Sequence, residues 1–285
     1  MDLAGEVWPG AGAPLLLLHG LASTRHIWDV AIPLIVGPLP VLAFDQRGHG
    51  ESGKPGRGYR FSSLAADALA MADAARLPRP LVVVGHSWGA NVALALGTLH
   101  PQQVAALVLV DGGLTNLQDS GMSWEDAERR MAPPDLTRFT REQLVAMVRR
   151  GRLGEVWSPA VEASVNALVE DLSDGHIRAR FPRADHMLAL RALWEQRPAE
   201  LLRGVRVPVL AVMAGADGGS WVDSKRRAVE RAQAVAPSLE VRWFDDAVHD
   251  IPLHRPRRLA EEMLGFLRRH PLAPPEAGDT AQGAG

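Results

Sequence analysis

Short apolar runs alternate along this chain with longer stretches of helical periodicity. The helical patterns lie at Ser62–Ala75, Ala90–Leu99, Ser224–Ala236 and Arg257–Arg269. The apolar runs contain no regular polar alternation, which is typical of strands buried on both faces. They are Leu15–Leu18, Val41–Phe44, Leu81–Val84, Val104–Val110 and Val209–Val212, with Val241–Phe244 as a weaker sixth run. This order predicts an α/β fold, a doubly wound and mostly parallel sheet with helices on both faces.

The segment 112–204 interrupts the alternation. It shows no convincing strand, it is helical in pattern, and it is rich in arginine. Structureless loops of such length are uncommon inside compact domains, so we expect a helical cap at 112–204. The cap divides the core into residues 1–111 and 205–270, and the Pro-, Ala- and Gly-rich tail 271–285 is expected to be disordered.

Composition and charge narrow the possible function classes. Hydrophobic residues make up 47% and charged residues 22%, which is typical of a soluble chain that buries a core. The formal net charge of −2 gives no electrostatic reason to expect a nucleic acid or an anionic membrane as partner. The chain has no cysteine, which excludes thiolate catalysis and cysteine-ligated metals. Its first residues lack a basic signal-peptide region, so we expect a cytoplasmic protein whose partner is a small-molecule substrate. The oligomeric state stays open.

The sharpest motif is Gly85-His86-Ser87-Trp88-Gly89, between a predicted strand and a predicted helix. A sharp strand-to-helix turn strains its central residue and needs nearly bare flanking positions, which Gly85 and Gly89 provide. Ser87 would then stand at the carboxyl edge of the sheet, where helix amides stabilise negative charge. We predict that Ser87 is a nucleophile, against the alternative that it merely caps the helix.

A serine nucleophile needs a base, and the base needs an anion to orient it. His249 follows the last predicted strand at the same sheet edge and is the predicted base. Asp217 follows the strand Val209–Val212 and is the predicted acid. Asp111, at the end of the strand Val104–Val110, is the alternative acid. The oxyanion hole is predicted to use the backbone N–H groups of Leu21 and Trp88.

Several motifs together resemble the α/β-hydrolase fold superfamily, in its serine hydrolase branch with a helical cap. They are the runs Leu15–Gly20, Asp45–Ser52 and Gly85–Ala90, with Asp217 and His249 after them. The resemblance implies a cap inserted after the sixth strand and a structural role for the turn at 45–50. It also implies two antiparallel strands at the start, of which residues 3–8 supply only one, so the first is expected to be missing or the start to be truncated. The spacing of the acid loop departs from the family pattern, which keeps Asp111 open.

These observations predict a cofactor-independent serine hydrolase acting on a small or medium ester, thioester or lactone. The same fold also occurs in carbon–carbon bond hydrolases, aminopeptidases, haloperoxidases and slow-turnover ligand receptors, which remain alternatives. A serine at position 87 makes the dehalogenase and epoxide hydrolase branches unexpected. No metal is expected, because no H-E-x-x-H or similar ligand spacing occurs. The tryptophans that could line an apolar substrate pocket are Trp28, Trp124, Trp157, Trp194 and Trp221.

Overall fold

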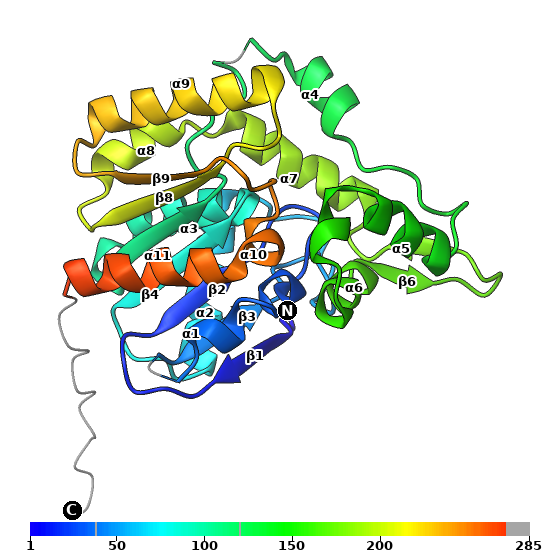
Figure 1. The fold of residues 1–285 in the computed structure, drawn as a ribbon, viewed down its shortest axis with the longest axis horizontal. Coiled ribbons are helices and arrows are strands. Elements are labelled where there is room, and N and C mark those ends of the chain that lie inside the picture. Colours follow the sequence, from blue (N-terminus) through cyan, green and yellow to red (C-terminus); the bar gives the residue numbers. More distant parts are fainter. Residues whose placement is uncertain (38, 120, 272–285) are drawn as a thin grey trace, which may run out of the picture.

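A seven-stranded sheet forms the centre of the protein in its computed structural model, which describes residues 1–37, 39–119 and 121–271 (Figure 1). The strand order is β1-β3-β2-β4-β5-β8-β9, and only β1 runs antiparallel to its neighbour. The strands are β1 (Gly5–Trp8), β2 (Leu15–Leu18), β3 (Val41–Phe44), β4 (Leu81–His86), β5 (Val104–Val110), β8 (Val209–Ala214) and β9 (Glu240–Phe244). The predicted α/β class and mostly parallel sheet are therefore confirmed.

Helices cover both faces of the sheet, and the central strands are accordingly apolar on both sides. In β2, Leu16 and Leu18 join one hydrophobic cluster while Leu15 and Leu17 join another, and all four are fully buried. The first cluster includes α2 (Phe61–Ala74), α3 (Trp88–Leu99), α8 (Pro198–Gly204) and α9 (Gly219–Val235). The second includes α1 (Ile32–Ile35), α10 (Ile251–His254) and α11 (Pro256–Arg269). Burial of successive residues toward opposite helix layers explains why these runs show no polar alternation.

The segment 112–204, which we predicted to be a cap and call the cap below, follows β5, the fifth strand along the chain, so the expected position after a sixth strand is wrong. The reason lies at the start, where one strand, β1, precedes β2 in the described structure. The edge strand β1 pairs antiparallel with β3, from Gly5 opposite Phe44 to Trp8 opposite Val41.

The cap contains helices and also a small sheet. Its helices are α4 (Trp124–Met131), α5 (Arg141–Arg150), α6 (Pro159–Asn166) and α7 (Arg183–Glu195). The antiparallel strands β6 (Val169–Asp171) and β7 (Ile177–Ala179) contradict the expectation that this segment has no strand. Three residues are too few for periodicity to reveal a strand. At the other end of the cap, α8 packs on α3 and α9, so the last residues of 112–204 belong to the core by their contacts.

The cap is attached to the core by aromatic and polar contacts. Phe181 of the cap stacks on His49 of the core, with ring centroids 3.6 Å apart. Tyr59 of the core donates a 2.7 Å hydrogen bond to the buried carboxylate of Asp185 on α7. Among the described residues, no helix is long and apolar enough to cross a membrane. The expected disordered tail lies, from residue 272 onward, outside the described residues.

Candidate active site

Ser87 occupies the sharp turn between β4 and α3, as its motif predicts. Its backbone has φ +53° and ψ −120°, a strained combination for a residue with a side chain. A Cβ on Gly85 would lie 2.2 Å from the carbonyl oxygen of Gly89, and one on Gly89 would lie 2.4 Å from that of Leu18. Only glycine fits at both positions, and the turn lifts Ser87 above the carboxyl edge of the sheet.

His249 lies within hydrogen-bond distance of Ser87. It follows β9, and its Nε2 accepts from the Ser87 hydroxyl over 2.9 Å. The His249 side chain is 41% exposed and Ser87 is partly exposed, so an external molecule can reach the pair. The structure thus brings together the predicted nucleophile and the predicted base.

The acid beside the imidazole is Asp111, so the expectation that Asp217 contacts this ring is wrong. His249 Nδ1 donates to Asp111 Oδ2 over 2.6 Å. Asp217 accepts from the backbone N–H of His249 over 3.3 Å and does not hydrogen-bond to its ring. The strand order explains the choice. Asp111 comes directly after β5, which pairs with the strand that carries Ser87, whereas Asp217 comes three residues after the more distant β8.

Asp111 is buried and surrounded by donors. Its Oδ1 accepts from the Ala214 N–H over 2.9 Å, and its Oδ2 accepts from Lys225 Nζ over 2.6 Å. Its backbone has φ +46°, a conformation that Asp tolerates better than most residues. Burial works to raise the pKa of Asp111, but the hydrogen bond and charge of His249, followed by the charge of Lys225, outweigh it and lower the pKa. Asp111 is therefore an anion at neutral pH.

The two histidines at the site differ in their electrostatics. Burial works to lower the pKa of His249, but the hydrogen bond and charge of Asp111 outweigh it and raise the pKa above its usual value. Burial and the neighbouring His249 lower the pKa of His86 to about 4. His86 Nε2 donates to the His249 carbonyl over 2.9 Å. His86 is thus neutral at working pH and positions the His249 backbone without competing as a base.

The loop after β2 packs directly against Ser87. A Cβ on Gly20 would lie 3.1 Å from Ser87 Cβ. His19 Nδ1 donates to the Gly20 carbonyl over 2.8 Å, and His49 Nε2 accepts from the Ala22 N–H over 3.1 Å. Within the described residues, neither the Leu21 nor the Trp88 amide donates a hydrogen bond to the protein. Both amides are therefore free to bind a ligand oxygen.

The tryptophans expected at a substrate pocket lie in different environments. Trp28 is fully buried in the core cluster on the α11 side, so it offers no surface to a substrate and its expected role is wrong. Trp157 donates to Glu162 inside the cap. Trp124 and Trp194 form an edge-to-face pair beside the Arg191 guanidinium, and Trp221 is 39% exposed. A pocket role for these four stays a prediction.

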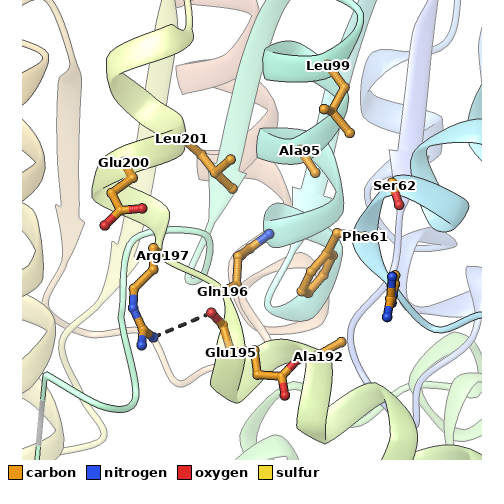
Figure 2. Close-up of a pocket in the computed structure, with 11 residues that line it drawn as sticks. Phe61, Ser62, Ala95, Leu99, Ala192, Glu195, Gln196, Arg197, Glu200 and Leu201 are labelled. Atoms are coloured by element: carbon orange, nitrogen blue, oxygen red, sulfur yellow. Dashed lines mark hydrogen bonds between the residues drawn. The ribbon is translucent and has the colours of Figure 1, made fainter.

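A cavity of about 420 Å³ lies between α2, α3, α7 and α8 (Figure 2). Its lining combines apolar side chains with charges of both signs, and the lining residues include Phe61, Ala95, Leu99, Ala192, Leu201, Arg60, Glu195, Arg197 and Glu200. Ser87 does not line it. Phe61 also contacts Trp88, with ring centroids 6.0 Å apart. In the part of the chain that the structure describes, no three His, Asp or Glu side chains are grouped so as to hold a metal ion.

Comparison with known proteins places this geometry in context. The family described as the alpha/beta hydrolase fold matches residues 13–145. The dihydrolipoyllysine-residue acetyltransferase component of the acetoin cleaving system of Pseudomonas putida is 26% identical over 94% of this chain and 66% of its own length. Pimeloyl-[acyl-carrier protein] methyl ester esterase of Neisseria meningitidis is 29% identical over 73% of this chain and 63% of its own length. The matches therefore span less than the full length of either relative.

Solved structures extend the likeness to almost the whole chain. The crystal structure of E-2-(acetamidomethylene)succinate hydrolase superposes with a TM-score of 0.77 at 20% identity. It covers 94% of this chain and 100% of the other. Together with the family match over residues 13–145 and the sheet order, this likeness shows that the chain has the α/β-hydrolase fold.

Proposed function

We propose that this protein is a serine hydrolase that cleaves a small or medium ester, thioester or lactone without a cofactor. The observation that carries the proposal is the continuous hydrogen-bond chain from Ser87 through His249 to Asp111, with steps of 2.9 Å and 2.6 Å. A nucleophile, a base and a buried anion in this order are the requirements of acyl transfer through a covalent intermediate. The names of the relatives, which include a methyl ester esterase, support the hydrolase class.

The reaction begins at the Ser87 hydroxyl. Its oxygen attacks the substrate carbonyl carbon while its proton passes to His249 Nε2, and Asp111 stabilises the imidazolium that forms. The intermediate carries its negative charge on the former carbonyl oxygen. The Leu21 and Trp88 amides donate to that oxygen, and Trp88 begins α3, whose N-terminus also favours negative charge.

Collapse of the intermediate releases the alcohol or thiol, which takes the proton from Nε2, and leaves an acyl group on Ser87. A water molecule then attacks the acyl carbon as His249 accepts its proton. The second collapse returns this proton to Ser87 and releases the acid. Every proton taken up by His249 is returned, so no external acid or base is consumed.

A fluorophosphonate probe and a panel of esters of increasing acyl length test this proposal. The wild type is expected to turn over at least one ester steadily, and peptide mapping is expected to find the probe on Ser87. Ser87→Ala removes only a small, partly exposed hydroxyl, so it is expected to lose hydrolysis and labelling while keeping its fold. Ser173→Ala, at an exposed position in the cap, is the matched control. Turnover retained by Ser87→Ala would refute the nucleophile, and a burst followed by very slow release would favour the receptor alternative.

A further inference from the structure

Lys225 is a buried cation directly behind the candidate acid. It lies on α9, and its side chain is 3% exposed. The chain contains two lysines, Lys54 and Lys225, among 31 basic residues, so arginine is the usual cation here. A buried ammonium is costly unless it is paired, which makes its partners informative.

The partners of Lys225 are both carboxylates of the site. Its Nζ donates to Asp111 Oδ2 over 2.6 Å, to Asp217 Oδ2 over 2.9 Å and to the Ala214 carbonyl over 3.2 Å. The Asp111 oxygen that binds Lys225 is the same one that accepts from His249 Nδ1. One ammonium thus joins the two acids that the sequence offered as alternatives.

We propose that Lys225 is a positioning residue that holds Asp111 and Asp217 as one bridged acid pair and thereby sets the protonation of the catalytic His249. The proposal rests on the proposed function, because it concerns the base of that reaction. Lys225 fixes Asp111 Oδ2 beneath the imidazole. It also fixes Asp217, whose other oxygen accepts from the His249 backbone N–H. Both the ring and the backbone of His249 are held through this one ammonium.

The bridge also controls the net charge that His249 faces. The two carboxylates and the ammonium together present a single negative charge to the imidazole. Two other titratable groups near His249 in the described structure are His86, which is neutral, and Asp250, next in the chain, whose charge raises the pKa of His249. Asp111 raises that pKa and Lys225 lowers it. Lys225 therefore helps to keep His249 neutral at working pH, as a base must be to accept the Ser87 proton.

Charge-altering variants at Lys225 and Asp217 make this inference testable. Lys225→Met leaves two negative charges near His249 and is expected to raise the His249 pKa by about one unit or more. In this variant Asp111 still accepts from His249 Nδ1 and from the Ala214 N–H, so it is expected to stay ionised. Asp217→Asn leaves Asp111 and Lys225 with no net charge between them, so it is expected to lower the His249 pKa. The shift should be only roughly half a unit, because Asp217 does not touch the ring. The double variant restores one negative charge and is expected to return close to the wild-type value.

The rate of fluorophosphonate labelling of Ser87 against pH reads these shifts without a known substrate, because only neutral His249 activates the serine. NMR titration of the His249 ring protons reads the same pKa without any probe. Lys54→Met, at the other lysine, is the control and is expected to leave the profile unchanged. A Lys225 that only fills space would slow labelling equally at every pH.

The outcomes separate this inference from the proposed function. A wild type that is not labelled at Ser87 would refute the proposed function, and the NMR titration would still test the bridge. Labelling with no shift in Lys225→Met, or shifts of the same sign in Lys225→Met and Asp217→Asn, would refute the bridge alone. If Lys225→Met does not fold, Asp217→Asn still decides, because its side chain is 21% exposed and the opposite shift is expected from it.

Discussion

Replacing Asp111 with asparagine is the most direct test of which carboxylate serves the imidazole. All three groups bound to the Asp111 carboxylate are donors, namely the Ala214 N–H, the Lys225 ammonium and the His249 Nδ1–H. An asparagine amide has one oxygen and one NH₂ group, so in either orientation its NH₂ faces a donor. With NH₂ toward His249, the imidazole is stabilised in the tautomer that carries its proton on Nε2. That tautomer cannot accept the proton of Ser87.

The magnitude follows from the loss of the negative charge that stabilises the imidazolium and, with NH₂ toward His249, also of the correct tautomer. In serine triads the equivalent change lowers kcat by about 10⁴, so we expect kcat/KM of Asp111→Asn to fall by about 10³ to 10⁴. This loss corresponds to about 4–5 kcal/mol of transition-state stabilisation. A buried donor left without an acceptor also lowers the free energy of unfolding by about 1–3 kcal/mol. Asp217→Asn keeps an oxygen for the His249 backbone N–H, so we expect a loss of less than about tenfold.

The assay compares kcat/KM of the two variants on one chromogenic ester at the alkaline plateau. Fluorophosphonate titration gives the concentration of intact sites, and chemical denaturation followed by circular dichroism gives the free energy of unfolding. A larger loss in Asp217→Asn than in Asp111→Asn would refute the reasoning. So would an Asp111→Asn enzyme whose kcat/KM stays close to that of the wild type.

Three further changes have expected outcomes. His249 must be neutral to accept a proton, and its pKa is raised above 6.5. We therefore expect kcat/KM to be low in mild acid, to rise through that pKa and to level off in mild alkali. A flat profile from about pH 5 to 9, with chemistry limiting the rate, would contradict this expectation. Gly85→Ala should lower the melting temperature, because the new Cβ would lie 2.2 Å from a backbone oxygen. Gly265→Ala, in the helix α11, is the control, because its Cβ would contact only the ends of arginine side chains at 3.4 Å or more. Gly265→Ala should therefore add about 0.5–1 kcal/mol to the free energy of unfolding, so two variants with equal melting temperatures would count against the steric argument. Tyr59→Phe removes the hydroxyl that donates to the buried Asp185 carboxylate, so it should lower the free energy of unfolding in denaturant by about 1–3 kcal/mol. An unchanged unfolding midpoint would show that water replaces the hydroxyl.

Local patterns were enough to predict the strands and the turn that carries Ser87. Strands such as Leu15–Leu18 are apolar without alternation because helix layers bury both of their faces, and this requirement is visible in consecutive residues. The turn at Ser87 is equally local, since its demand for glycine falls on positions two residues to either side. His249 could be predicted as well, because it follows the last strand at the same sheet edge.

Other features leave weak local signals. The hairpin of β6 and β7 has three residues in each strand, which is too short for a period to appear. Trp28 has the same local pattern as a pocket residue, and only its full burial in the tertiary structure shows otherwise. Gly112, directly after Asp111, marks a close approach, because a Cβ there would lie 2.1 Å from the Ser87 carbonyl oxygen. Two glycines also follow Asp217, so this signal does not separate the two acids.

The choice between Asp111 and Asp217 depended on the tertiary structure. Both residues follow parallel strands at the same edge, so local sequence offers them equally. The strand order decides, because β5 lies next to the strand of Ser87, and His249 reaches Asp111 across a separation of 138 residues. Lys225 was not predicted for the same reason, since one lysine on a helix gives no sign of its partners. Sequence by itself determined the buried strands and the turn that carries Ser87, whose requirements lie within a few residues, whereas packing decided which distant charges meet.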